Sequence, residues 1–437
     1  MGCPVSYNVL PGVTLTVLPT DRFKVGMLSL CFALPFSREQ ATERSLLMSV
    51  LRRGCVSYPT IADINRRLDE LYATPYRVID STRAGCHYVG LGAELLDERY
   101  LLDDMDLCGN VVSLMSEMLF SPLTENGCLS ERYVAQEKKN AVDHVRALQN
   151  QPATYAMARF SDAFHTNDPE SLPILEGTEE RIGALTPEGL TAQWRDILCH
   201  APLQCFYIGS WRNDHLITCL REALSPYLEG LSRELVNVHP VCRPSPSWEG
   251  VRRVEEEGDR GQSHLILGFR TPVTLQSPDY FATMLLNELL GQSPISRLFV
   301  HVREKHSLCY HISSRYRMLQ GELTVACGIS ADNREMAERA ILEQIDVLKK
   351  GEFTETEWLA AKKSLIGSCR QLKDSTRSLS DFYSVRLPLC PDHTPEGYAD
   401  RFDTVTREQV MEAARGLRLD MVYFRQGTGE DEEDGDD

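Results

Sequence analysis

The chain has 437 residues, of which 42% are hydrophobic and 25% are charged, and its formal net charge is −17. This composition is typical of a soluble globular protein, and the length favours two domains of about 200 residues each. The charge argues against a nucleic-acid-binding protein, because phosphate backbones are bound by clustered Lys and Arg, and no such cluster dominates here.

Fourteen cysteines are scattered singly between Cys3 and Cys390 and form no CxxC pair. The sequence shows neither a secretory apolar segment nor an apolar run long enough to span a membrane. We therefore expect reduced, mostly buried thiols in a cytoplasmic protein with no membrane partner.

Helices and strands alternate along the first half of the chain. A helix is predicted after Ser37, which has the spacing of a capping box to Gln40. A strand is predicted at HYVGLGAEL, from His87. Helical stretches are predicted at 101–119 and after the polar starter LSERYVAQEKKNAV at 129–142.

Residues 233–255 are predicted to form a linker. Pro240, Pro244 and Pro246 lie among serines in this stretch, which can be neither a helix nor a central strand. The apolar run His264–Phe269 then begins a second sheet. The chain is thus divided near its middle.

The second half repeats the order of elements in the first. ELTVACGIS from Glu322 matches the first-half strand, and a helix at 333–348 and FTETEWLAAKKSLI from Phe353 follow it. Tyr133 and Trp358 occupy the same place in the two copies, 225 residues apart. Each half also closes alike, with LTPEGLTAQWRDIL or VTREQVMEAARGL before a strand with paired aromatic residues. These repeats predict a tandem duplication.

The predicted fold class is α+β, with each copy an α/β sandwich that has a mostly antiparallel sheet covered by helices. The N-terminal copy is placed at residues 1–232 and the C-terminal copy at residues 256–426. The tail, residues 427–437, has seven acidic and no apolar residues. It is predicted to be disordered, because such a block cannot bury enough surface to order itself.

The segment SRLFVHVREKHSLCY, residues 296–310, carries a resemblance to a known family. It resembles the C-terminal-half signature of the insulinase, pitrilysin and mitochondrial-processing-peptidase family: SRLF, two residues, VREK, two residues, LAY. QSHLILGF from Gln262 and YFATMLLNELLG from Tyr280 also fit, and the resemblance spans nearly the whole chain. It implies a zinc-peptidase fold in which the two halves form a clam-shell.

In active members of that family a first-domain helix carries HxxEH. Histidines at i and i+4 lie on one helical face and share a zinc ion, while the glutamate activates the metal-bound water. Registering LRRG of this chain on the family's LFKG places the motif on Ser45, Leu46, Leu47, Met48 and Ser49. Both histidines are thus replaced by serine, and the base is replaced by methionine.

The third zinc ligand of the family is a glutamate on another helix. That helix resembles EKKNAVDHVRALQNQP from Glu137, which puts Asp143 or His144 at the ligand position. One remaining ligand does not hold zinc, because a site needs about three protein donors and serine hydroxyls are poor ligands. We therefore expect no metal and no catalytic residue in this chain alone.

Arg303 and Tyr310 match a second-domain pair that contacts the substrate near the scissile carbonyl in the family. A guanidinium and a phenol can donate hydrogen bonds to a carbonyl oxygen that becomes negative in the transition state. The alternative is that Arg303 pairs with Glu304 and that Tyr310 is a half-buried strand residue. His306 and Ser307 depart from the usual basic residue and glycine, and loss of the glycine is expected to stiffen or shift the turn.

The resemblance implies a non-catalytic, substrate-binding subunit of a heterodimeric zinc metallopeptidase that processes peptides or unfolded protein segments. The expected partner is a homologous HxxEH-containing chain that holds the zinc, and this chain has no cofactor. The chain is most similar to inactive bacterial members associated with aminopentanol modification of elongation factor P and with bacteriocin maturation. The alternative is a structural or assembly subunit with no role in proteolysis.

Overall fold

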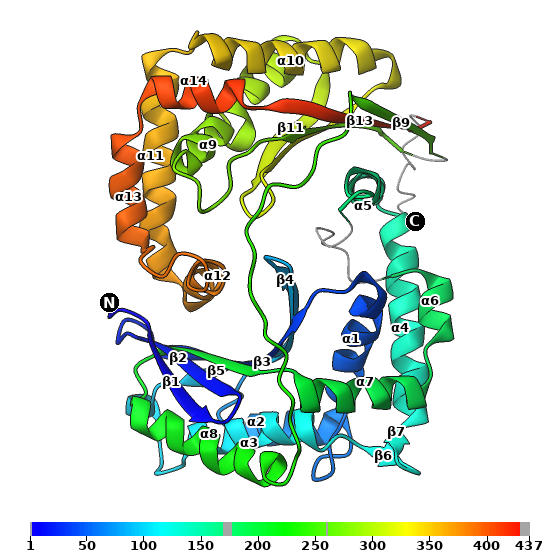
Figure 1. Cartoon of the computed structure of the whole chain (residues 1–437), viewed down its shortest axis with the longest axis vertical. Coiled ribbons are helices and arrows are strands. Elements are labelled where there is room, and N and C mark those ends of the chain that lie inside the picture. Colours follow the sequence, from blue (N-terminus) through cyan, green and yellow to red (C-terminus); the bar gives the residue numbers. More distant parts are fainter. Residues whose placement is uncertain (1, 169–176, 259–260, 429–437) are drawn as a thin grey trace, which may run out of the picture. The chain divides into compact units, whose positions relative to one another are not determined.

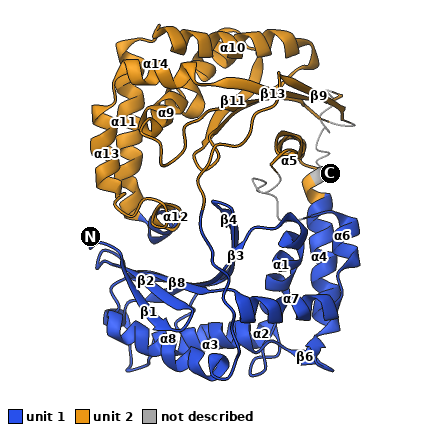
Figure 2. Cartoon of the chain, viewed as in Figure 1, with its two compact units in different colours: residues 1–146, 174–240, 375–381 blue, residues 147–173, 241–374, 382–437 orange. Residues whose placement is uncertain are grey.

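The computed structural model describes residues 2–168, 177–258 and 261–428 (Figure 1). The chain folds into two compact units, shown in different colours in Figure 2. Unit 1 comprises residues 1–146, 174–240 and 375–381, and unit 2 comprises residues 147–173, 241–374 and 382–437. Each unit contains one large mixed sheet and the helices that cover it.

The sheet of unit 1 has six strands. Their order across the sheet is β1 (Val5–Leu10), β2 (Val13–Pro19), β8 (Leu203–Gly209), β3 (Val25–Pro35), β5 (Cys86–Leu96) and β4 (Tyr76–Arg83). All neighbours are antiparallel except β2 and β8, which are parallel. The sequence of β3, VGMLSLCFALP, is almost entirely apolar, and the strand is buried along nearly its whole length.

Helices bury one face of this sheet. They are α1 (Arg38–Leu51), α2 (Ile61–Glu70), α3 (Leu107–Phe120), α4 (Glu131–Gln149), α6 (Glu179–Ala184), α7 (Pro187–His200) and α8 (Asn213–Leu228), with a short turn η1 (Glu98–Tyr100) and a hairpin of β6 (Thr124–Glu125) and β7 (Cys128–Leu129). The core joins Leu28 and Leu30 of β3 to Leu47 of α1 and Val112 of α3. Ser37 precedes α1, but its side chain makes no capping hydrogen bond, so the capping box expected there does not form.

The sheet of unit 2 has five strands. Their order is β11 (Cys309–Arg317), β12 (Glu322–Ile329), β10 (Ser263–Arg270), β13 (Arg418–Gln426) and β9 (Arg252–Glu257). Only β13 and β9 are parallel neighbours. The helical segments are α5 (Pro152–Phe164), α9 (Tyr280–Asn287), the π-helical η3 (Glu288–Gln292) and η4 (Leu298–Lys305), η5 (Ala331–Asn333), α10 (Arg334–Lys350), α11 (Glu355–Gln371), η6 (Leu372–Asp374), α13 (Pro395–Thr404) and α14 (Arg407–Arg415), while α12 (Thr376–Arg386) is divided between the units.

The two sheets have the same topology. The order β2-β8-β3-β5-β4 in unit 1 corresponds to β9-β13-β10-β12-β11 in unit 2. In both, the only parallel pair joins the first two strands of that order. This correspondence confirms the predicted duplication of one α+β domain with a mostly antiparallel sheet. The clam-shell arrangement of the halves stays a prediction.

The compact units differ from the predicted domain boundaries. Residues 147–173 belong to unit 2, where Phe160 and Phe164 of α5 pack on the sheet, and residues 375–381 belong to unit 1. Strand β9 begins at Arg252, within the stretch predicted to be a linker. The predicted disordered tail lies outside the described residues beyond residue 428. Within the described part of the chain, no helix combines the length and apolar character needed to cross a membrane.

Candidate functional site

Helix α1 carries Ser45, Met48 and Ser49, the positions at which HxxEH is expected. Met48 is 1% exposed and packs in the core of unit 1, as a buried apolar side chain rather than a base. The hydroxyl of Ser45 donates a hydrogen bond to a carboxylate oxygen of Asp80 on β4. The residues at these positions do not fit a zinc ion, because none offers a nitrogen, thiolate or carboxylate ligand.

The contacts of Ser45 do not have the order of a Ser-His-Asp catalytic triad. Asp80 Oδ1 lies 2.7 Å from Nε2 of His87, a fully buried residue on β5, so Asp80 stands between Ser45 and His87. In a nucleophilic triad the histidine must stand between the serine and the carboxylate, because it takes the serine proton. The order here is reversed, so Ser45, Asp80 and His87 do not form such a triad.

The third expected ligand position lies on α4. Asp143 and His144 are both exposed there. Glu137 lies earlier on the same helix. Its buried carboxylate forms an ion pair with Arg53, which follows α1. The two helices that carry metal ligands in the family are therefore joined here by an ion pair.

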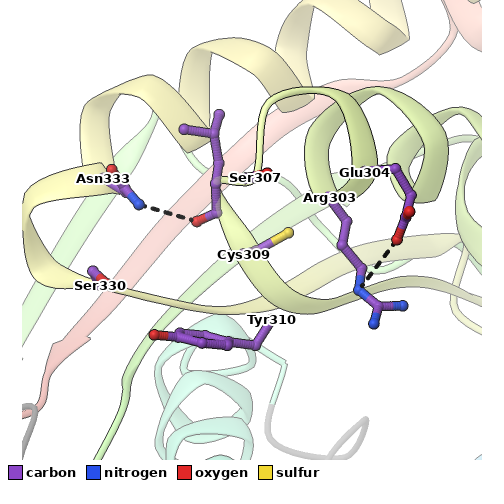
Figure 3. Close-up of a pocket in the computed structure, with 8 residues that line it drawn as sticks. Arg303, Glu304, Ser307, Cys309, Tyr310, Ser330 and Asn333 are labelled. Carbon is purple, nitrogen blue, oxygen red and sulfur yellow. Dashed lines mark hydrogen bonds and ion pairs between the residues drawn. The ribbon is translucent and has the colours of Figure 1, made fainter.

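The second predicted site is a pocket of about 390 Å³ in unit 2 (Figure 3). Its wall is formed by the end of η4, the start of β11 and the turn after β12. The lining residues are Arg303, Glu304, Ser307, Leu308, Cys309, Tyr310, Ser330 and Asn333. The structure thus brings Arg303 and Tyr310, both predicted from the sequence, to one pocket.

Arg303 presents its guanidinium at the mouth of this pocket. Its side chain is 39% exposed, and its Nε lies 3.9 Å from Oε1 of Glu304, which is too far for a hydrogen bond. The guanidinium also lies 4.6 Å from the ring centre of Phe299, which orients it by a cation–π contact. The predicted pairing with Glu304 is therefore present but weak, and it leaves the guanidinium donors accessible.

Tyr310 projects from an irregularity in the sheet. Cys309 pairs with Ile329 and His311 pairs with Gly328, so the register shifts at Tyr310 and forms a β-bulge. A bulge turns a side chain away from its normal face, and Tyr310 is 67% exposed. This exposure contradicts the alternative of a half-buried strand residue.

Ser307 occupies the place of the family's glycine in the turn before Tyr310. Its backbone φ is 51°, in the left-handed region that glycine adopts without strain. The turn thus keeps the glycine-like conformation despite the serine, and the expected shift of the turn is not needed to explain the position of Tyr310.

Cys309 lies between Arg303 and Tyr310 in the pocket (Figure 3). Burial raises the pKa of its thiol to about 11, although the positive charge of Arg303 acts in the opposite direction. A thiol with this pKa is almost fully protonated at neutral pH and is a poor nucleophile. Cys309 is therefore a poor candidate for covalent catalysis.

Ser330 and Asn333 are lining residues that the sequence analysis did not find. They follow β12, and the pairing of Cys309 with Ile329 brings this turn beside Tyr310. The amide of Asn333 donates a hydrogen bond of 3.5 Å to the carbonyl of Leu308, which ties the turn to the start of β11. These two residues could have been found only by pairing β11 with β12 in the correct register, which places the turn after β12 next to Tyr310.

Comparison with known proteins agrees with the fold and with these substitutions. Residues 200–365 match the family described as the peptidase M16 inactive domain. A Bacillus subtilis relative named probable inactive metalloprotease YmfF is 29% identical over 420 residues, covering 95% of this chain and 96% of the relative.

Two solved structures share the fold over nearly the whole chain. The crystal structure of a conserved protein from Enterococcus faecalis has a TM-score of 0.90 at 24% identity, covering 98% of this chain and 100% of that chain. The crystal structure of a peptidase M16 inactive domain from Pseudomonas fluorescens has a TM-score of 0.75 at 18% identity, covering 97% of this chain and 98% of that chain. The fold is thus shared with M16 metallopeptidase homologues over nearly the whole chain. The chain is similar to inactive homologues of these peptidases, and its own α1 positions carry no zinc ligand.

Proposed function

We propose that this chain is the substrate-binding subunit of a two-chain zinc metallopeptidase that processes peptides or unfolded protein segments. The proposal rests on a contrast between the positions expected to bind zinc and the pair expected to bind substrate. Ser45, Met48 and Ser49 cannot hold the metal, whereas Arg303 and Tyr310 are retained and accessible at one pocket. A chain without any role in peptide binding has no need for this exposed pair.

The exposed side chains suit an extended peptide. Arg303 offers several N–H donors and Tyr310 offers a hydroxyl on a large aromatic ring, so together they can hold a backbone carbonyl and cover its neighbours. Such donors stabilise the negative charge that develops on a carbonyl oxygen during hydrolysis. The proposed partner is a homologous HxxEH-containing chain, which supplies the zinc and the metal-activated water.

The proposal is tested with a complex purified from the native cell through a tag on this chain. We expect an HxxEH-containing homologue to copurify and the complex to cleave a short peptide. Arg303→Ala is expected to lower turnover by about 10²–10³-fold while the two chains still copurify. If turnover by the Arg303→Ala complex is unchanged, Arg303 does not bind the substrate and the proposal is wrong.

Lys305→Ala is the matched control. Lys305 is an exposed cation at the end of the same π-helical segment, but it does not line the pocket. Its removal is expected to leave turnover unchanged. A complex that assembles but never cleaves peptides, with or without Arg303, would support the alternative of a structural or assembly subunit.

A further inference from the structure

Three side chains that bind soft metals meet in unit 1, on helices that carry none of the peptidase positions. Cys108 is in the first turn of α3, and His215 and Cys219 are one turn apart on α8. Positions i and i+4 lie on one helical face, and α8 packs on α3. The two sulfur atoms and a ring nitrogen all lie within 4.8 Å of one another.

The distances agree with a tetrahedral site. Cys219 Sγ lies 3.5 Å from His215 Nε2. Zinc–sulfur and zinc–nitrogen bonds of about 2.3 and 2.0–2.1 Å at a tetrahedral angle separate the two ligand atoms by about 3.5 Å. The existing side-chain positions therefore need little movement to share one ion.

Asp106 lies beside the cluster, but its carboxylate is not among the three ligand atoms that all lie within 4.8 Å of one another. Its Oδ1 lies 3.1 Å from His215 Nε2. The carboxylate is held in place by the backbone N–H of Gly109, which donates to Oδ1 at 2.9 Å. A Cβ at position 109 would lie 2.2 Å from Asp106 Oδ2, so glycine leaves the room that the carboxylate occupies.

The cluster is open on one side. Cys108 and Cys219 are buried, with 0% and 4% exposure, and form its floor. The side chains of His215 and Asp106 are 36% and 52% exposed and form its rim, which gives an ion a path of entry. The ring of Trp211 stacks on His215 at 5.4 Å and 16°, and this contact fixes the plane of the imidazole.

The environment of Cys108 favours the protonated form of its thiol. The hydrogen bond with Cys219, followed by burial, raises the pKa of the Cys108 thiol. A metal ion binds thiolates, so it must displace the thiol protons, and its affinity is expected to increase with pH.

We propose that Cys108, His215 and Cys219 form a binding site for a soft divalent cation of the zinc class. Two sulfur ligands and an imidazole select such an ion over magnesium or calcium, which prefer oxygen. The three protein ligands come from α3 and α8, so the ion joins these two helices, and its fourth position faces the exposed side of the cluster. The site is separate from Ser45 and Asp143 on α1 and α4, and it does not depend on the proposed peptidase function.

The test uses the full chain, reduced, freed of metal with a chelator and titrated with zinc. We expect one equivalent to bind and to raise the melting temperature. Cobalt in place of zinc is expected to show a thiolate-to-cobalt charge-transfer band. Cys108→Ser, Cys219→Ser and His215→Ala are each expected to weaken binding by at least about tenfold.

Two controls make the test specific. Cys369→Ser removes another buried helical cysteine, in unit 2, and is expected to leave zinc binding unchanged. Because a buried cysteine variant can fail to fold, His215→Ala supplies a variant at a partly exposed ligand. The double variant Asp143→Ala, His144→Ala is expected to bind zinc like the wild type.

Three results would overturn the site. The first is a reduced wild-type chain that binds no zinc. The second is zinc that stays bound in the Cys108 and Cys219 variants but is lost from the Asp143, His144 double variant, which would place it at the peptidase positions and contradict the proposed function as well. The third is a Cys108–Cys219 disulfide in the purified chain that yields no zinc site after reduction.

Discussion

His165 and Glu322 are 157 residues apart in the chain, yet Nε2 of His165 lies 3.1 Å from both carboxylate oxygens of Glu322. Glu322 is fully buried on β12 and also pairs with Arg270 and Arg317. His165 follows α5, so this cluster attaches a helix from the first half of the sequence to the second sheet.

Replacing Glu322 by Gln is expected to destabilise unit 2. The change removes a buried charge that pairs with both Arg270 and Arg317, and loss of one partner from a buried pair costs about 3–5 kcal/mol. Asp420 still pairs with Arg270 in the variant, so the lower end of this range is expected. Urea unfolding measures the difference. Glu343→Gln, at an exposed position on α10, is the control and is expected to change the unfolding free energy by less than about 0.5 kcal/mol. Equal effects of the two variants would contradict the role of the cluster.

The same cluster predicts how stability depends on pH. Burial by itself raises the pKa of Glu322, but the hydrogen bond from His165 and the charges of Arg317 and Arg270 lower it from 4.5 to about 2. A lowered pKa means that the folded state binds the proton less well than the unfolded state does. The stabilisation is therefore present above pH 4.5 and is lost as the pH falls toward 2.

Unfolding curves of wild type and Glu322→Gln at several pH values check this dependence. The difference in unfolding free energy is expected to be constant between pH 5 and 7 and to shrink at lower pH, because only the wild type has the carboxylate to lose. If the difference in unfolding free energy grows as the pH falls, the pKa of Glu322 is not lowered in the folded state, and the prediction is wrong.

The parts of the fold that the sequence predicted are those with a local signal. β5 and β12 have nearly continuous apolar runs, and both are buried as expected. β9 was missed because its sequence RRVEEE is charged. It is an edge strand whose residues alternate between partly buried and exposed.

Long-range packing explains what the sequence could not predict. Ala156, Phe160 and Phe164 give α5 an apolar face at helical spacing, but the spacing does not say which of two similar sheets covers that face. The pair Arg303 and Tyr310 was found because both residues lie within one motif. Cys108 and His215 lie far apart in the chain, and only the packing of α3 on α8 brings them together.

Ser307→Gly is expected to stabilise the turn before Tyr310. The left-handed φ of 51° costs a residue with a Cβ roughly 1–2 kcal/mol, and glycine avoids this cost but loses more entropy on folding. The net gain is expected to be up to about 1 kcal/mol. Thermal or urea unfolding measures it, and Ser307→Val is expected to change the stability in the opposite direction. A glycine variant less stable than wild type would show that the serine side chain holds the turn.

Tyr310→Phe separates the hydroxyl from the ring at the proposed substrate site. Tyr310 is 67% exposed, so the variant is expected to unfold within about 0.5 kcal/mol of wild type. If the hydroxyl donates to the carbonyl oxygen in the transition state, kcat of the two-chain complex falls by about 10²-fold with little change in KM. Tyr100→Phe, at an exposed tyrosine in unit 1, is the control and is expected to leave both constants unchanged. A rise in KM without a fall in kcat would instead assign Tyr310 to ground-state binding of the peptide.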